Sequence, residues 1–151
     1  IREERLFTDP FYLYVSVKSP LFGKKVVSVG DIDLSQMLLL SDGHCLRSQV
    51  LDLCNSGGIP YKQVKFESGS LDTIIRMIDA YGGMTILPQM ALPFLAEEHK
   101  RQLVMFRPEE KAQREIALAV STNFFKHSVY RVLREEILRT RELPITLMNS
   151  L

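Results

Sequence analysis

The sequence predicts an α/β fold, in which strands and helices alternate along the chain. Short apolar runs typical of strands are separated by segments whose apolar residues recur with helical spacing. The 151 residues are 46% hydrophobic and 25% charged, a globular composition that is rich enough in apolar side chains for a core. The order of these segments, βαβαβαββα, favours a mainly parallel, twisted sheet covered by helices.

The first three strands are expected before residue 67. Residues 11–17 and 37–40 are short apolar runs, and residues 61–66 alternate in polarity. Between the second and third runs, four residues recur with helical spacing at i, i+4, i+7 and i+8: Leu46, Val50, Leu53 and Cys54. This spacing predicts an amphipathic helix with Cys54 at the edge of its buried face.

The start of this helix carries its own signals. Ser41 or Asp42 is expected to cap it, and Gly43 allows a tight turn before His44 and Cys45 enter the first helical turn.

The later elements follow from capping residues and periodicity. Ser70 is a good N-cap for a second helix, which Gly82 and Gly83 end and whose apolar face consists of Leu71, Ile74, Ile75 and Ile78. We expect strands at residues 84–87, 103–106 and 116–120 and a third helix at residues 91–100. The last helix places on one face Val129, Val132, Leu133 and Ile137.

Charge and hydropathy exclude several classes of protein. The chain has 19 Lys and Arg against 18 Asp and Glu, so no net field attracts nucleic acid or an anionic membrane. No apolar stretch approaches the roughly 18 to 20 residues of a membrane span, and residues 1–5 do not resemble a signal peptide. We therefore expect a cytoplasmic location. Because the chain begins with Ile1, we also expect it to be a piece of a longer protein.

The two cysteines lie nine positions apart in the predicted helix. At 100° per residue, Cys45 and Cys54 point in opposite directions, and a helix would separate their Cα atoms by about 13 Å. A disulfide requires roughly 4.4 to 6.8 Å. The two thiols therefore cannot bond while the helix is intact.

The two positions also predict different chemistry. Cys45 lies at the positive end of the helix dipole near Arg47, which favours the thiolate provided that Asp42 is directed away, whereas apolar neighbours keep Cys54 protonated. A thiolate and a second thiol are what a peroxide reaction needs, because the first becomes a sulfenic acid and the second resolves it to a disulfide. Unwinding the helix at a cost of ~3 kcal/mol would make this disulfide more oxidising by roughly 60 mV. We expect a reversible redox switch.

Each residue also has a plain structural interpretation. Taken alone, Cys54 fits a small buried hydrophobe, Arg47 a solvated helix charge and Arg114 a surface charge. We expect no cofactor and no metal site, because the cysteines and histidines lack the spacing of zinc ligands and no phosphate-binding glycine loop is present. A Ser/His/Asp hydrolase is excluded because no nucleophile elbow is present.

Several motifs resemble the LysR-type transcriptional regulators that sense hydrogen peroxide. Residues 43–47, followed by Gln49 and Cys54, resemble the redox-switch segment of that family. Further matches follow in the same order at residues 70–73, at residues 82–88 and at Arg114. The resemblance extends from about Arg5 to the last helix. We call residues 43–54 the switch segment.

The resemblance implies a regulatory domain with a periplasmic-binding-protein-like fold of two α/β lobes. Residues 1–151 would form part of it, with about 14–112 as the second lobe and 1–13 and 113–151 contributing to the first. A winged helix-turn-helix that binds DNA, and the earlier part of the first lobe with threonines that position peroxide, would lie outside this chain.

The resemblance also implies roles for particular residues. Cys45 matches the peroxide-reacting cysteine, Cys54 the resolving cysteine, His44 its neighbour in the peroxide site and Arg114 an arginine that helps to hold the thiolate. Supporting positions are Gly43 and Arg47. The implied partners are hydrogen peroxide, DNA, a second copy of the chain in a homodimer or larger oligomer, and cytosolic thiols that reduce the disulfide.

Two alternatives remain open from the sequence. One is a LysR-type domain that binds a small organic effector, and the other is a two-cysteine thiol peroxidase, for which a thioredoxin-like scaffold would be expected. Dimerisation gains support from apolar residues near the end of the chain, namely Phe124, Phe125, Leu147 and Leu151.

Overall fold

The computed structural model describes residues 1–57, 66–123 and 126–142 and divides the chain into two compact units. Unit 1 joins Ile1–Asp9 to Glu115–Leu151, and unit 2 is Pro10–Arg114. These boundaries lie near those expected for two lobes at residues 13 and 113. The identification of the units with the lobes of an effector domain stays a prediction.

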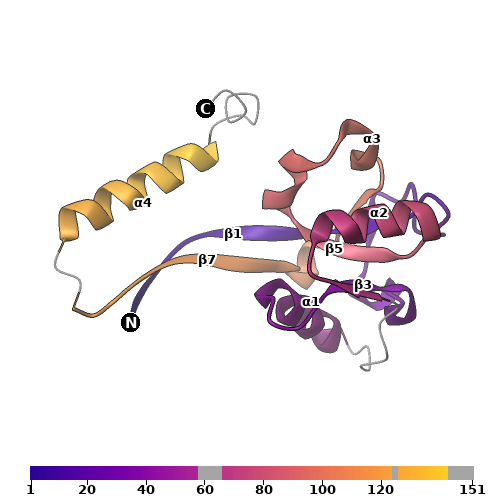
Figure 1. Cartoon of the computed structure of the whole chain (residues 1–151), viewed down its shortest axis with the longest axis horizontal. Helices are drawn as coiled ribbons and strands as arrows, with labels where there is room; N and C mark the ends of the chain where they lie inside the picture. Colours follow the sequence, from indigo (N-terminus) through magenta and orange to yellow (C-terminus); the bar gives the residue numbers. More distant parts are fainter. Residues whose placement is uncertain (58–65, 124–125, 143–151) are drawn as a thin grey trace. The chain divides into compact units, whose positions relative to one another are not determined.

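Two long strands run through both units. They are β1 (Arg2–Val15) and β7 (Gln113–Val120), which pair with each other (Figure 1). Both are longer than the sequence predicted, because an apolar run marks only part of each strand. The first nine residues of β1 are exposed or half-buried except for Asp9, which is buried, whereas Leu13 to Val15 are fully buried.

The main sheet is mixed. Its order is β2 (Val26–Val27), β6 (Leu103–Phe106), β1 and β5 (Met84–Pro88), with β7 also beside β1. β1 runs antiparallel to β5 and β6, whereas β2 runs parallel to β6. The α/β class is confirmed, but the sheet is not mainly parallel. Periodicity identifies strands without giving their direction, and the two-residue β2 is too short to give a periodic signal.

A second sheet has two strands, and the switch segment lies between these strands in the chain. Strand β3 (Leu38–Leu40) runs parallel to β4 (Phe66–Ser68), and helix α1 (Cys45–Ser56) connects them in a βαβ unit (Figure 1). Met37, just before β3, forms a parallel bridge with Met84. The strand predicted at residues 61–66 lies outside the described residues except for Phe66.

Helix α2 (Leu71–Tyr81) confirms the predicted second helix. Ser70 is its N-cap, and Gly82 ends it with a φ of +79°, which favours glycine. The prediction of a third helix over residues 91–100 is wrong: a 3-10 helix occupies Gln89–Phe94, and the α-helix α3 is only Glu97–Lys100. Pro93 interrupts the segment because it lacks an N–H and fixes φ. Further 3-10 helices among the described residues are Val29–Asp31, Leu34–Gln36 and Pro108–Glu110.

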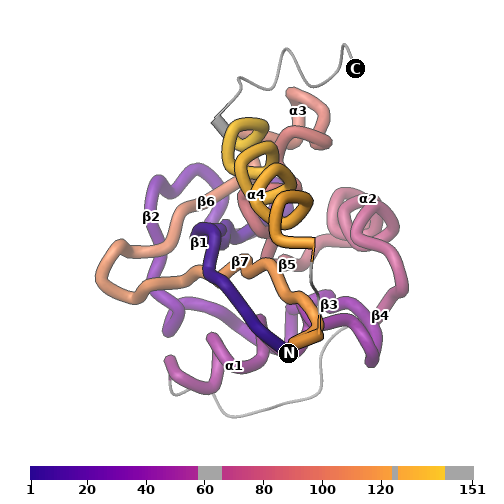
Figure 2. The backbone as a smooth tube through the Cα atoms, turned by 90° about the vertical axis from the view of Figure 1, so that its left-hand side faces the viewer, coloured from indigo at the N-terminus to yellow at the C-terminus, as the bar shows by residue number. Residues whose placement is uncertain are grey.

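The hydrophobic core of unit 2 lies among its sheets and its helices α1 and α2 (Figure 2). Among its most completely buried members are residues of β1, β3, α1, α2 and β5, which include Leu13, Tyr14, Leu39, Val50, Cys54, Ile74, Ile78 and Leu87. The helix that carries both cysteines is thus part of the packed core of this unit.

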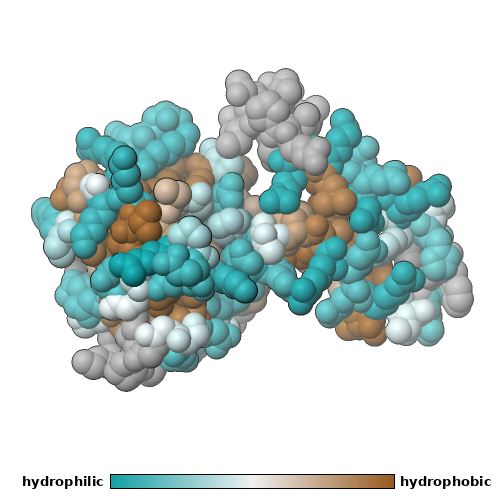
Figure 3. Space-filling view, turned by 180° about the vertical axis from the view of Figure 1, so that it is seen from behind, coloured by the Kyte–Doolittle hydropathy of each residue, from teal (hydrophilic) through white to brown (hydrophobic). Residues whose placement is uncertain are grey.

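Helix α4 (His127–Glu142) is the last described element and belongs to unit 1. The Tyr130 hydroxyl and the Arg134 Nε both donate to the carboxylate of Glu4, at 2.7 and 2.5 Å. Apolar side chains reach the surface on both units (Figure 3). On α4, three apolar side chains are about half exposed: Val129, Val132 and Leu133. The four apolar residues that the sequence analysis cited in support of dimerisation lie outside the described residues; they are Phe124, Phe125, Leu147 and Leu151. Across residues 1–57, 66–123 and 126–142, every helix is too short or too polar to cross a membrane.

Candidate functional site

The site begins at the turn between β3 and α1. Gly43 has a φ of +93°, as the predicted tight turn requires, and His44 occupies the N-cap position of α1. The expectation that Ser41 or Asp42 caps the helix is wrong, because α1 begins one residue later, at Cys45, and the exposed His44 makes no side-chain capping bond. The carboxylate of Asp42 is instead paired with Arg47.

Cys45 is the first residue of α1, and its side chain is exposed. Backbone N–H groups in the first turn of a helix lack intrahelical partners, and the helix dipole favours negative charge there. Cys45 thus has the exposure and the position at a helix N-terminus that were expected, and its reactivity stays a prediction. His44 precedes it directly in the chain, and its role beside the sulfur stays a prediction.

Cys54 lies near the other end of the same helix and has no exposed surface. Burial raises the pKa of the Cys54 thiol to about 11, because the thiolate would lose its hydration. The predicted asymmetry between the two positions is thus confirmed for burial. Both cysteines are free, and the intact helix keeps their Cα atoms about 13 Å apart.

The buried thiol predicts a pH dependence of folding. The pKa of Cys54 is about 11 in the folded chain against an ordinary value of 9.0, so between these values the folded state binds the proton more tightly than the unfolded state. This contribution is complete below pH 9 and is lost as the pH rises to 11, by about 2 kcal/mol.

The measurement is denaturant unfolding of the reduced protein and of a Cys54→Ala variant at pH 8 and pH 11. The stability difference between them should shrink by about 2 kcal/mol at the higher pH. A difference that is the same at both pH values would show that the thiol titrates normally.

Arg47 is buried rather than solvated, with 8% of its surface exposed. Its Nη1 donates to the carbonyl oxygen of Leu40 at 3.1 Å and lies 2.7 Å from the Glu67 carboxylate, while its Nε lies 2.9 Å from Asp42. The interpretation of Arg47 as a solvated helix charge is therefore wrong. Its guanidinium connects α1 to the end of β3, to the following turn and to β4.

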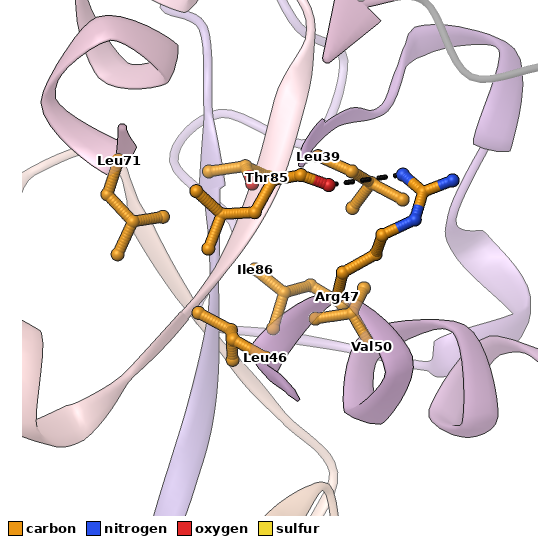
Figure 4. Close-up of a pocket in the computed structure, with 8 residues that line it drawn as sticks. Leu39, Leu46, Arg47, Val50, Leu71, Thr85 and Ile86 are labelled. Carbon is orange, nitrogen blue, oxygen red and sulfur yellow. Dashed lines mark hydrogen bonds between the residues drawn. The ribbon is translucent and has the colours of Figure 1, made fainter. Parts of the chain in front are cut away.

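A small cavity lies beneath Arg47 (Figure 4). It measures about 10 Å³ and lies among apolar side chains of α1, α2, β3 and β5, including Leu39, Leu46, Val50, Leu71 and Ile86. This volume holds about one water molecule and no organic effector. The underside of α1 is thus closely packed.

Two further observations concern the switch segment and its predicted partners. Among the described residues, the one buried side-chain oxygen or nitrogen without a hydrogen-bond partner is Oε1 of Gln49, one turn after Cys45. Such an atom makes α1 less stable than its packing alone implies.

Arg114 is the second residue of β7, on a different element from the cysteines, and its role in holding the thiolate stays a prediction. No cluster able to hold a metal ion occurs in the part of the chain that the structure describes.

The family model described as the LysR substrate binding domain matches residues 1–142 of the chain. A DNA-binding transcriptional dual regulator, OxyR of Escherichia coli K12, is 32% identical over 137 residues, which cover 89% of this chain and 44% of that protein. A hydrogen peroxide-inducible genes activator of Dickeya chrysanthemi is 33% identical over 150 residues, covering 98% of this chain and 48% of that protein. The chain thus spans about half the length of these relatives.

Solved structures give the same comparison. The reduced form of the OxyR regulatory domain from Pseudomonas aeruginosa superposes with a TM-score of 0.75 at 27% identity, covering 91% of this chain and 65% of that chain. OxyR from Porphyromonas gingivalis gives a TM-score of 0.72 at 27% identity, covering 95% of this chain and 64% of that chain.

Proposed function

Since the chain belongs to the LysR substrate binding domain family, we propose that it is the regulatory part of a transcription regulator that senses hydrogen peroxide with Cys45 and Cys54. One observation carries this proposal: a single helix holds an exposed cysteine in its first turn and a fully buried cysteine near its end. The Dickeya chrysanthemi relative, which is named as a hydrogen peroxide-inducible genes activator, supports it, and the Escherichia coli relative supports the role in transcription.

The reaction has two steps. The Cys45 thiolate attacks one oxygen of hydrogen peroxide and the O–O bond breaks, which gives a sulfenic acid on Cys45 and a hydroxide that takes up a proton to become water. The Cys54 sulfur then attacks the sulfenic sulfur, its proton and the hydroxyl leave as water, and a disulfide forms. Two electrons pass from the two thiols to peroxide. The reverse step takes two electrons from cytosolic thiols such as glutathione.

The second step requires α1 to unwind. Its two sulfurs cannot approach within bonding distance while residues 45–54 are helical. Oxidation therefore replaces a packed helix by a different conformation, and that change is the signal. We assign the readout to an altered homodimer or larger oligomer and to DNA held by a winged helix-turn-helix elsewhere in the protein, in the cytoplasm.

In this proposal the protein is a sensor and not a peroxidase. A sensor needs to react with peroxide only once per signal, whereas a peroxidase consumes peroxide over many turnovers. Its family fold differs from the thioredoxin-like scaffold expected of a two-cysteine peroxidase.

The proposal is tested by peptide mapping of the full-length protein after addition of about one equivalent of hydrogen peroxide. The wild-type protein should form a Cys45–Cys54 disulfide within one chain, and a Cys54→Ser variant should accumulate a sulfenic acid on Cys45 that dimedone traps. A Cys45→Ser variant is the matched control and should yield neither product. Two thiols that stay reduced in the wild-type protein would contradict the proposal and leave the small organic effector as the remaining function.

A further inference from the structure

Arg47 lies between the two cysteines in the chain and is the most deeply buried charged side chain of the switch segment. A buried guanidinium is costly unless hydrogen bonds and opposite charges compensate for its lost hydration. Here the compensation comes from groups outside α1: the Leu40 carbonyl, Asp42 and Glu67. The helix is thereby attached to a framework that does not itself contain a cysteine.

We infer that Arg47, Asp42 and Glu67 form an electrostatic latch that holds the switch segment in its helical, reduced conformation, with Glu67 as the positioning residue that sets the reduction potential of the Cys45–Cys54 pair. The inference rests on the proposed function and adds what determines the balance between the reduced and oxidised states. We call these three side chains the Arg47 latch.

The two carboxylates of the latch differ in strength. Glu67 lies 2.7 Å from the guanidinium with 37% of its side chain exposed, whereas Asp42 lies 2.9 Å away with 90% exposed. Water and salt screen an exposed pair more than a shielded one. Glu67 is therefore the principal counter-charge of Arg47.

The latch must open when the disulfide forms. Glu67 and Leu40 are fixed by the paired strands β3 and β4, with Leu40 opposite Ser68 and Leu39 opposite Glu67. Bringing Cys54 to Cys45 rearranges the backbone on both sides of Arg47 and moves its guanidinium away from these partners. The latch therefore stabilises the reduced state alone. Weakening it favours the disulfide and makes its reduction potential more negative.

The latch acts on the equilibrium and not on the first chemical step. Cys45 reacts with peroxide while α1 is still folded, and its exposed sulfur belongs to a residue outside the latch. A change at Glu67 should leave the initial rate of peroxide consumption unaltered. This separation of potential from rate distinguishes the latch from a residue that contacts peroxide.

The test is the reduction potential of the full-length protein, measured in glutathione redox buffers for Glu67→Gln, Asp42→Asn and a control. The matched control is Asp72→Asn, which removes the same charge from an exposed pair with Arg76 on α2. For Glu67→Gln the equilibrium constant for disulfide formation should rise about tenfold, which is a shift of ~30 mV to more negative potential. Asp42→Asn should give about a twofold change and Asp72→Asn none.

Two different failures can be told apart. If Glu67→Gln has the wild-type potential, or changes the initial peroxide rate together with the potential, the latch is overturned while the disulfide chemistry stands. If the wild-type protein forms no Cys45–Cys54 disulfide in any glutathione buffer, the proposed function fails and the latch fails with it. Equal loss of thermal stability by Glu67→Gln in the reduced and oxidised proteins would show a structural role only.

Discussion

Replacing Cys45 with serine is expected to lower the rate at which the protein consumes hydrogen peroxide by at least about a thousandfold. A serine hydroxyl does not attack peroxide at neutral pH, so only Cys54 would remain as a nucleophile. That sulfur is fully buried, and with a pKa of about 11 it is thiolate in only about one molecule in ten thousand at pH 7.

The measurement is stopped-flow consumption of peroxide by the reduced full-length protein. Cys54→Ser is the matched control, because the first step needs Cys45 alone and should keep the wild-type rate. A Cys45→Ser variant that reacts within tenfold of the wild-type rate would place the reactive sulfur at Cys54 and contradict the assigned order of the two steps.

The second large effect is expected in the backbone of α1 after oxidation. In the reduced protein, the amides of the helix beyond its first turn donate to backbone carbonyls of the helix, and one face packs into the core through Leu46, Val50 and Cys54. Opening such a helix costs about 3 kcal/mol, which corresponds to a protection of roughly 150-fold against hydrogen exchange. A disulfide that requires an unwound helix removes this protection for as long as the disulfide persists. Amides of α2, which carries no cysteine, should keep theirs.

Several features of the site could be predicted because they depend on neighbours in the chain. Helical spacing places Val50 and Cys54 on the buried face and Cys45 on the opposite side, and the structure confirms both placements. Gly43 was predictable from the turn that must precede the helix. Local periodicity was thus sufficient to predict that Cys54 is buried and Cys45 exposed.

The environment of Arg47 could not be predicted in this way. Its partner Glu67 is twenty residues later in the chain, on β4, and their contact depends on the register between two three-residue strands. Asp42 was expected to cap the helix, yet α1 begins at Cys45 with His44 in the N-cap position, and Asp42 pairs with Arg47 instead. The mixed sheet has a similar origin, because strand direction is set by pairing between distant segments.

The most direct test of the central claim is hydrogen exchange of α1, measured by mass spectrometry on the full-length protein before and after one equivalent of peroxide. We predict that peptides covering residues 45–56 lose roughly 100-fold or more of their protection when the Cys45–Cys54 disulfide forms, while peptides of α2 are unchanged. Full protection of residues 45–56 in the oxidised protein would contradict the claim, because the two sulfurs cannot bond across an intact helix.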